Sequence, residues 1–251
     1  MASAEGSPRT AALEAADRGD DRTGQAVAHR SLGIAYARIE RYPEAEFHLQ
    51  RTLELCRELG ELVNEAHAHI NLSSMLGFQG RHREALQHDL RALEIARSTD
   101  DQLGQARALN AVGWDYATLG DHDQAIHYCE QALELLEGQG DRRAQAGAWD
   151  SLGYSHHHLG HYSHALTCHR NAIAMFRETG DRYYEASTLT HLMDTLEVTR
   201  DIDGAREAGR QALAILEDLG HSEAAAVRAR LHRLRTLKCT SSGHSSTLDA
   251  G

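Results

Sequence analysis

The chain has few of the residues that interrupt helices or build a sheet core. It contains only two prolines in 251 residues, and aromatic residues make up 5% of it. Both prolines, Pro8 and Pro43, lie near the start, so no proline breaks a helix beyond that point. Apolar residues account for 41% of the sequence, and alanine is abundant among them. This composition favours closely packed helices over a β-sheet.

Long apolar runs and paired cysteine motifs are also missing. No run of 18 apolar residues occurs, and the first 21 residues contain no apolar stretch of the kind found in signal peptides. The four cysteines, Cys56, Cys129, Cys168 and Cys239, form no CxxC motif, which argues against a disulfide framework. We therefore expect a cytoplasmic protein that does not associate with membranes.

Positive charge is scarce as well. The formal net charge is −11, and the 26 basic residues include a single lysine, Lys238. An acidic chain without a basic block is repelled by a phosphate backbone. We therefore expect no direct binding to nucleic acid.

What the sequence does contain is a 40-residue repeat. Alanine recurs at this interval in five places: Ala45, Ala85, Ala125, Ala165 and Ala205. A second column holds Leu53, Leu93, Leu133, Ile173 and Leu213. Glycine ends four of the repeats, at Gly60, Gly140, Gly180 and Gly220, and Asp100 takes its place in the remaining one. A constant period of this size predicts an all-α solenoid of stacked units.

Each repeat reads as a helical hairpin, with a first helix (A) and a second helix (B). In the third repeat, apolar residues at helical spacing predict helix A over 105–119, and Gly120 begins the turn. Asp123 is the predicted cap of helix B, which runs to about Glu137. Glycines in the middle of helix A, such as Gly113, predict a close approach to helix B, because glycine is otherwise costly there.

These patterns predict the following organisation. Residues 1–21 hold a partial B helix of a preceding repeat with a flexible start, either as a cap or as the remainder of a repeat outside this chain. Five repeats follow, at 22–60, 61–100, 101–140, 141–180 and 181–220. Residues 221–238 form a C-terminal capping helix whose arginines, Arg230 among them, face solvent, and residues 239–251 form a disordered tail.

The pattern resembles the tetratricopeptide repeat family. In the fourth repeat the resemblance depends on Leu152-Gly153, His156, Gly160-His161-Tyr162, Ala165 and Ala172-Ile173. The first repeat has Leu32-Gly33, Tyr36, Tyr42-Pro43, Ala45 and Thr52-Leu53 at the same places. Ser73 and Met193 replace the mid-helix glycine in repeats two and five. The 40-residue period, against the usual 34, is similar to the C-terminal repeat domains of large actinobacterial transcriptional regulators.

The resemblance implies a right-handed superhelix whose A helices line an inner groove for a protein or peptide. Carried over by register, the groove residues of this chain are Arg30, Arg38, Asn71, Phe78, Arg107, Asn110, Trp114, Asp150, Tyr154, His157 and Asp194. The wider set includes His67, His191 and Glu197. The early residues are basic and the later ones acidic, which suits an extended peptide with an acidic end and an apolar side chain.

We therefore expect a non-catalytic, peptide-binding scaffold, a regulatory interaction module of a bacterial signalling or transcription-control system. One alternative is an autoinhibitory or sensing domain of a larger DNA-binding regulator. A homodimer through the exposed first helix is also open.

The 18 histidines suggest a further alternative, a metal-dependent enzyme that uses the histidines of the fourth repeat. Against it, the chain has no HExxH motif, P-loop, GxSxG or GxGxxG. We therefore expect no catalytic residues, no metal site and no cofactor.

Overall fold

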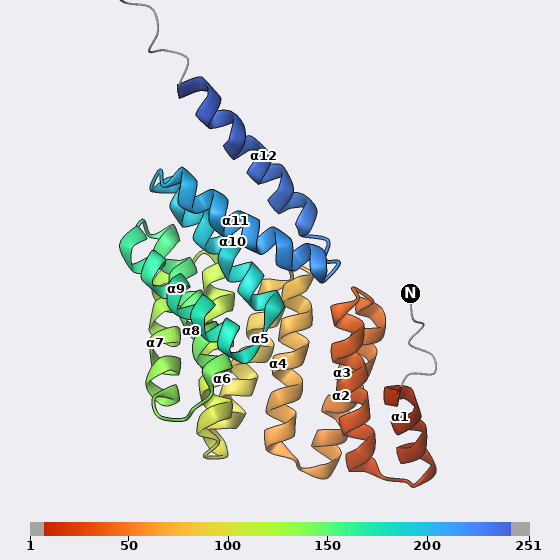
Figure 1. Ribbon diagram of the computed structural model, residues 1–251. Helices are drawn as coiled ribbons and strands as arrows, with labels where there is room; N and C mark the ends of the chain where they lie inside the picture. Colours follow the sequence, from red (N-terminus) through yellow and green to blue (C-terminus); the bar gives the residue numbers. More distant parts are fainter. Residues whose placement is uncertain (1–7, 242–251) are drawn as a thin grey trace, which may run out of the picture. The chain divides into compact units, whose positions relative to one another are not determined.

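The computed structural model describes residues 8–241, and all regular structure in this range is α-helical. The chain divides into two compact parts, before and after the bond between Gln139 and Gly140. The N-terminal part contains α1 (Pro8–Arg18), α2 (Arg22–Arg38), α3 (Tyr42–Leu59), α4 (Leu62–Phe78), α5 (His82–Ser98), α6 (Gln102–Leu119) and α7 (His122–Leu136). The C-terminal part contains α8 (Arg142–His158), α9 (Tyr162–Thr179), α10 (Arg182–Val198), α11 (Ile202–Asp218) and α12 (Ala224–Ser241). Figure 1 shows these helices joined by short turns.

The turns explain the regular length of the helices. A residue with a left-handed backbone stands at each multiple of twenty from 20 to 220. Seven of these residues are glycines, for which this conformation carries no steric cost. The other four, Asp20, Glu40, Asp100 and Arg200, adopt φ values of 50° to 63° although they have a Cβ. Asp100 therefore takes the backbone role of the missing glycine, as the repeat pattern predicts.

Aspartates begin several of the helices. The side chain of Asp101 accepts the backbone N–H of Gly104 at 2.8 Å, and Asp21 does the same for Gly24 at 2.9 Å. In the third repeat the sequence-based cap is wrong: Asp121 caps α7, and Asp123 lies within its first turn. The chain enters the left-handed conformation at Gly120, so the next residue is already in position to cap.

The two helices of a repeat pack through small residues. The five alanines of the first column are fully buried. A Cβ built on Gly33 would lie 2.6 Å from Leu49 and 3.3 Å from the carbonyl oxygen of Ala45. On Gly113 it would lie 2.5 Å from the sulfur of Cys129. The predicted close approach of helix A to helix B is thereby confirmed.

In the N-terminal part, α1 packs against α2, and leucines from α2, α3 and α4 form the core. In the C-terminal part, α12 packs against α11 and contributes Val227, Leu231 and Leu234 to the core around Met193. The helix continues to Ser241, so the predicted tail cannot begin at residue 239. The rest of that tail, 242–251, and the predicted flexible start, 1–7, lie outside the described residues.

The predicted fold class, an all-α repeat solenoid, is confirmed. Cys56, Cys129 and Cys168 are buried free thiols. None of the helices within residues 8–241 combines the length and the apolar character needed to cross a bilayer.

Candidate functional site

In the N-terminal part, the helices that carry the predicted groove residues contact one another in order: α2 contacts α4, and α4 contacts α6. We call their solvent-facing side chains the A-helix face. Three of the predicted residues are exposed on these helices: Arg38, Phe78 and Arg107. Four are half-buried: Arg30, Asn71, Asn110 and Trp114. These residues thus come from three successive A helices.

Two arginines of the A-helix face act on the pKa of His67 on α4. Burial lowers its pKa most, and the charges of Arg30 on α2 and Arg107 on α6 lower it further. Asp101 acts in the opposite direction. The helices that carry the two arginines, α2 and α6, both contact α4. Arg30 and Arg107, predicted by register alone, therefore lie on the two A helices beside that of His67.

Not every predicted residue of this face is turned wholly outward. The carboxamide oxygen of Asn110 accepts a weak hydrogen bond from the thiol of buried Cys129, at 3.8 Å. This contact ties Asn110 to the helix behind it. Phe78, by contrast, leaves 49% of its area exposed at the end of α4, where it offers apolar surface.

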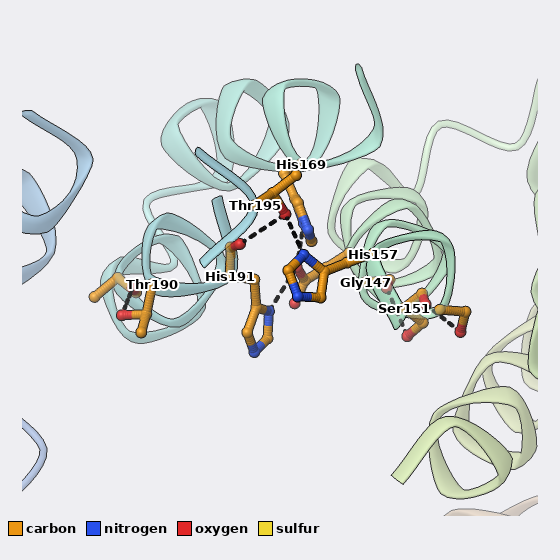
Figure 2. Close-up of polar contacts among 10 residues, drawn as sticks. Gly147, Ser151, His157, His169, Thr190, His191 and Thr195 are labelled. Carbon is orange, nitrogen blue, oxygen red and sulfur yellow. Dashed lines mark hydrogen bonds and ion pairs between the residues drawn. The ribbon is translucent and has the colours of Figure 1, made fainter. Parts of the chain in front are cut away.

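In the C-terminal part the corresponding helices are α8 and α10, which also contact each other. Asp150 of α8 is at the centre of the polar contacts there. Its Oδ1 atom accepts hydrogen bonds from Nδ1 of His169 on α9, at 3.2 Å, and from Nδ1 of His191 on α10, at 3.0 Å. Figure 2 shows the two histidines approaching from separate helices.

The three groups of this cluster have different protonation behaviour. Burial alone would raise the pKa of Asp150, but His191 and His169 outweigh it and hold that pKa below its ordinary value. Burial also opposes the charged form of His191, yet Asp150 raises the pKa of that histidine. Burial lowers the pKa of His169, despite its contact with Asp150. Asp150 thus favours the charged form of His191, whereas burial favours the neutral form of His169.

An aromatic ring, that of Tyr154, lies next to this cluster. The ring of Tyr154 lies 5.3 Å from that of His191 and 4.4 Å from that of His158, measured between centroids. His157 donates from Nδ1 to the hydroxyl of Thr195 at 2.9 Å (Figure 2), and this hydroxyl donates to the carbonyl of His191 at 3.1 Å. The predicted residues Asp150, Tyr154 and His157 thus belong to one network with His191.

Asp194, the remaining predicted residue, contacts the C-terminal helix. Arg230 of α12 forms an ion pair with Asp194 and donates to Glu197 of α10 at 2.7 Å. The expectation that Arg230 faces solvent is therefore wrong, because two carboxylates of α10 bind it. Asp150, Asp194 and Glu197 of the C-terminal part are therefore already paired within the chain.

The register-based prediction of the groove missed two residues of the C-terminal part, His169 and Arg230. His169 belongs to a B helix, and family patterns place binding residues on A helices. The sequence showed Arg230 only as one of several arginines of α12. It did not indicate that carboxylates of α10 would bind it.

Comparison with known proteins now adds a family and a fold. Residues 64–138 match a family model described as tetratricopeptide repeat. Comparison of the whole sequence with curated proteins gives no match. The family model thus covers less than half of the chain, and the match holds for these residues only.

Solved structures share the fold over most of the chain. BtubC (BKLC) from P. vanneervenii is 18% identical with a TM-score of 0.65, over 84% of this chain and 89% of that one. A Rap protein complexed with Competence and Sporulation Factor is 22% identical with a TM-score of 0.64, over 91% and 68%. A signal transduction ATPase with numerous domains and a tetratricopeptide repeat sensor, from Pyrococcus horikoshii, is 20% identical with a TM-score of 0.63. The match covers 90% of this chain but 35% of that protein.

Proposed function

We propose that the chain is a non-catalytic, protein-binding repeat module, and that the A-helix face of its N-terminal part binds a peptide segment with an acidic end. The observation that carries this proposal is the position of Arg30 on α2 and of Arg107 on α6, the two A helices that contact α4 from either side. Guanidinium groups bind carboxylates through paired, charge-assisted hydrogen bonds. One guanidinium on the A helix before α4 and one on the A helix after it suit a ligand that crosses all three helices.

Apolar and amide side chains on the same helices support a peptide over a small anion. Trp114 of α6 is half-buried and Phe78 of α4 is 49% exposed. Asn71 is half-buried on α4, where an amide can pair with the main chain of a ligand. Aromatic and arginine side chains together are typical of the residues that dominate binding energy at protein interfaces.

The test begins with selection of binding peptides from a displayed random library, using the full chain. Acidic peptides should be enriched, and the double variant Arg30→Ala/Arg107→Ala should bind them at least about tenfold more weakly than the wild type. The matched control is Arg83→Ala/Arg97→Ala, which removes two exposed arginines from α5, a B helix of the same part. Equal affinity of wild type and the Arg30/Arg107 variant would contradict the proposal.

The context of this binding is proposed as bacterial regulation, in the cytoplasm. Support comes from the Rap protein, whose solved structure is a complex with Competence and Sporulation Factor, and from the fold it shares with this chain. At this identity the likeness establishes the fold alone, so the regulatory role, the location and a homodimer stay predictions.

A second candidate is a sensing domain of a larger regulator. It is favoured by the Pyrococcus horikoshii protein, whose repeats are called a sensor and of which this chain spans about a third. Sequencing the coding region upstream of Met1 tests it. An in-frame ATPase or DNA-binding domain is expected, and a stop codon followed by a ribosome-binding site would contradict it.

A further inference from the structure

The buried cluster of the C-terminal part brings three side chains with metal-ligating atoms together. One oxygen of Asp150 faces the Nδ1 atoms of both His169 and His191. One ligand atom from each residue lies within 4.8 Å of the others. We propose that Asp150, His169 and His191 form a binding site for a divalent first-row transition metal ion, with zinc as the physiological candidate.

The distances suit the proposed ion. In a tetrahedral zinc site, nitrogen and oxygen ligands about 2.0–2.2 Å from the metal lie about 3.4 Å from one another. The two nitrogen–oxygen distances to Asp150 are 3.2 and 3.0 Å. These two distances are within a few tenths of an ångström of those in a zinc site, and the three ligand atoms all lie within 4.8 Å of one another.

The ligand chemistry selects the class of metal. Two imidazoles and one carboxylate are the donor set that zinc, cobalt and nickel bind well. Magnesium and calcium prefer sites made of oxygen atoms, so they fit this set poorly. With three protein ligands, one coordination position is left for water or for a ligand of another molecule.

The fold holds the three side chains in place. They come from three helices, α8, α9 and α10, which pack against one another. A Cβ on Gly153 would lie 2.6 Å from the ring of His169, so the absence of a side chain at Gly153 makes room for the imidazole. Nδ1 of His169 faces Asp150, whereas its Nε2 atom is buried with no hydrogen bond among the described residues.

The partly exposed edge of this cluster is formed by Asp150 and His191. The side chain of His169 is fully buried, whereas those of Asp150 and His191 leave 11% and 15% of their areas exposed. The open coordination position would therefore lie beside His191, next to the ring of Tyr154. Figure 2 shows His157 and Thr195 beside the same histidines.

The test uses the full chain without a histidine tag, freed of metal by a chelator and then by dialysis. We expect about one zinc ion per chain on titration. Cobalt should give the intense visible absorption of a tetrahedral site, and zinc should raise the midpoint of thermal unfolding by several degrees, because the ion binds only the folded state.

Two variants and one matched control assign the site. Asp150→Asn keeps the size of the side chain but removes its charge, and His191→Gln removes one imidazole at the more exposed edge. Each should weaken zinc binding at least about 100-fold and abolish the cobalt absorption, while helix content stays unchanged. The control, His156→Gln/His161→Gln/His164→Gln, removes a second group of neighbouring histidine rings in the same part and should leave zinc binding unchanged.

The outcomes are distinct. Less than about 0.1 zinc per chain in the wild type would overturn the proposal. Zinc binding that survives in Asp150→Asn and His191→Gln but is lost in the triple control variant would also overturn it, because the ion would then sit at the other histidines. Peptide binding through Arg30 and Arg107 is independent of both results.

Discussion

The sulfur of Met193 lies 2.8 Å from the point where a Cβ would stand on Gly209. In the first, third and fourth repeats the small residue of this contact is a glycine of helix A, as in Gly153 against His169. The second repeat has Ser73 against Asp89. In the fifth repeat the large and small partners have exchanged helices. The replacement of glycine by Met193, which looked like a departure from the pattern, is therefore compensated 16 residues later.

Close packing at Gly113 and open space at Gly77 predict opposite effects when each of these glycines of the N-terminal part is replaced by alanine. Gly113→Ala places a methyl group 2.5 Å from Cys129 and 3.1 Å from the carbonyl oxygen of Ala125, so we expect a loss of about 1–3 kcal/mol in the free energy of unfolding. Gly77→Ala meets no atom within 4 Å and should stabilise its helix by about 0.5–1 kcal/mol. Urea denaturation of both variants measures the difference. Equal effects would show that Gly113 has no packing role.

A buried carboxyl pair predicts that acid stabilises part of the chain. Asp89 is fully buried and accepts a hydrogen bond from Ser73 at 2.5 Å. Burial raises the pKa of Asp89 well above its ordinary value, and the nearby Asp115 raises it further. Burial also raises the pKa of Asp115, to about 7. His82, with Nδ1 3.9 Å from Asp115, is the basic group that faces the pair.

The number of protons bound in the folded and unfolded chains decides how the free energy of unfolding changes with pH. Between about pH 4 and 7 the folded chain holds a proton on this pair that the unfolded chain has lost, so its contribution to stability falls as the pH rises. Asp89→Asn keeps the hydrogen-bonding shape and removes the second carboxyl. We expect it to raise the free energy of unfolding by about 1–3 kcal/mol more at pH 8 than at pH 5. A gain that is the same at both pH values would contradict a shared proton.

Histidine pairs predict the opposite dependence. Nδ1 of His69 lies 2.8 Å from Nδ1 of His88, so one ring must donate and the other accept, which requires an unprotonated nitrogen. Burial, then His88 and Arg57, lower the pKa of His69 to about 4, against a small opposing effect of Glu65. Arg91 also acts against the charged form.

Because the folded-state pKa is lowered, the unfolded chain binds more protons below pH 6.5, and stability is lost as the pH falls from 6.5 toward 4. His69→Gln should remove about 1–3 kcal/mol of this acid-induced loss. The measurement is urea denaturation at pH 7 and pH 5. His127→Gln, at an exposed position of α7, is the control and should leave the pH dependence unchanged. A wild-type profile in His69→Gln would rule out the neutral pair.

Much of the fold could be predicted because the repeat determines it. The alanine column, the mid-helix glycines and the turn at Asp100 each follow from register, and each has its predicted structural role. Register could also place Arg30 and Arg107 on the A helices of the first and third repeats, since equivalent positions recur along a stack. It could not predict that Arg230 would pair with Asp194, because α12 lies outside the repeat pattern.

The contacts among Asp150, His169 and His191 could not be predicted from the sequence, for a different reason. His169 and His191 lie 19 and 41 positions from Asp150, so no local motif joins them. The position of His169 holds Leu49, Asp89, Cys129 and Gly209 in the other repeats, which identifies it as a packing position. Only the distances between side chains show that in the fourth repeat this position carries a possible metal ligand.

The most direct test of the account is a charge exchange on the A-helix face of the N-terminal part. A peptide selected by the wild type should bind Arg30→Glu/Arg107→Glu at least about 100-fold more weakly, and lysines in place of its acidic residues should restore binding to the variant. Fluorescence anisotropy measures all four combinations. This reciprocal pattern is the expected result. Equal affinity of the original peptide for the wild type and the variant would contradict it.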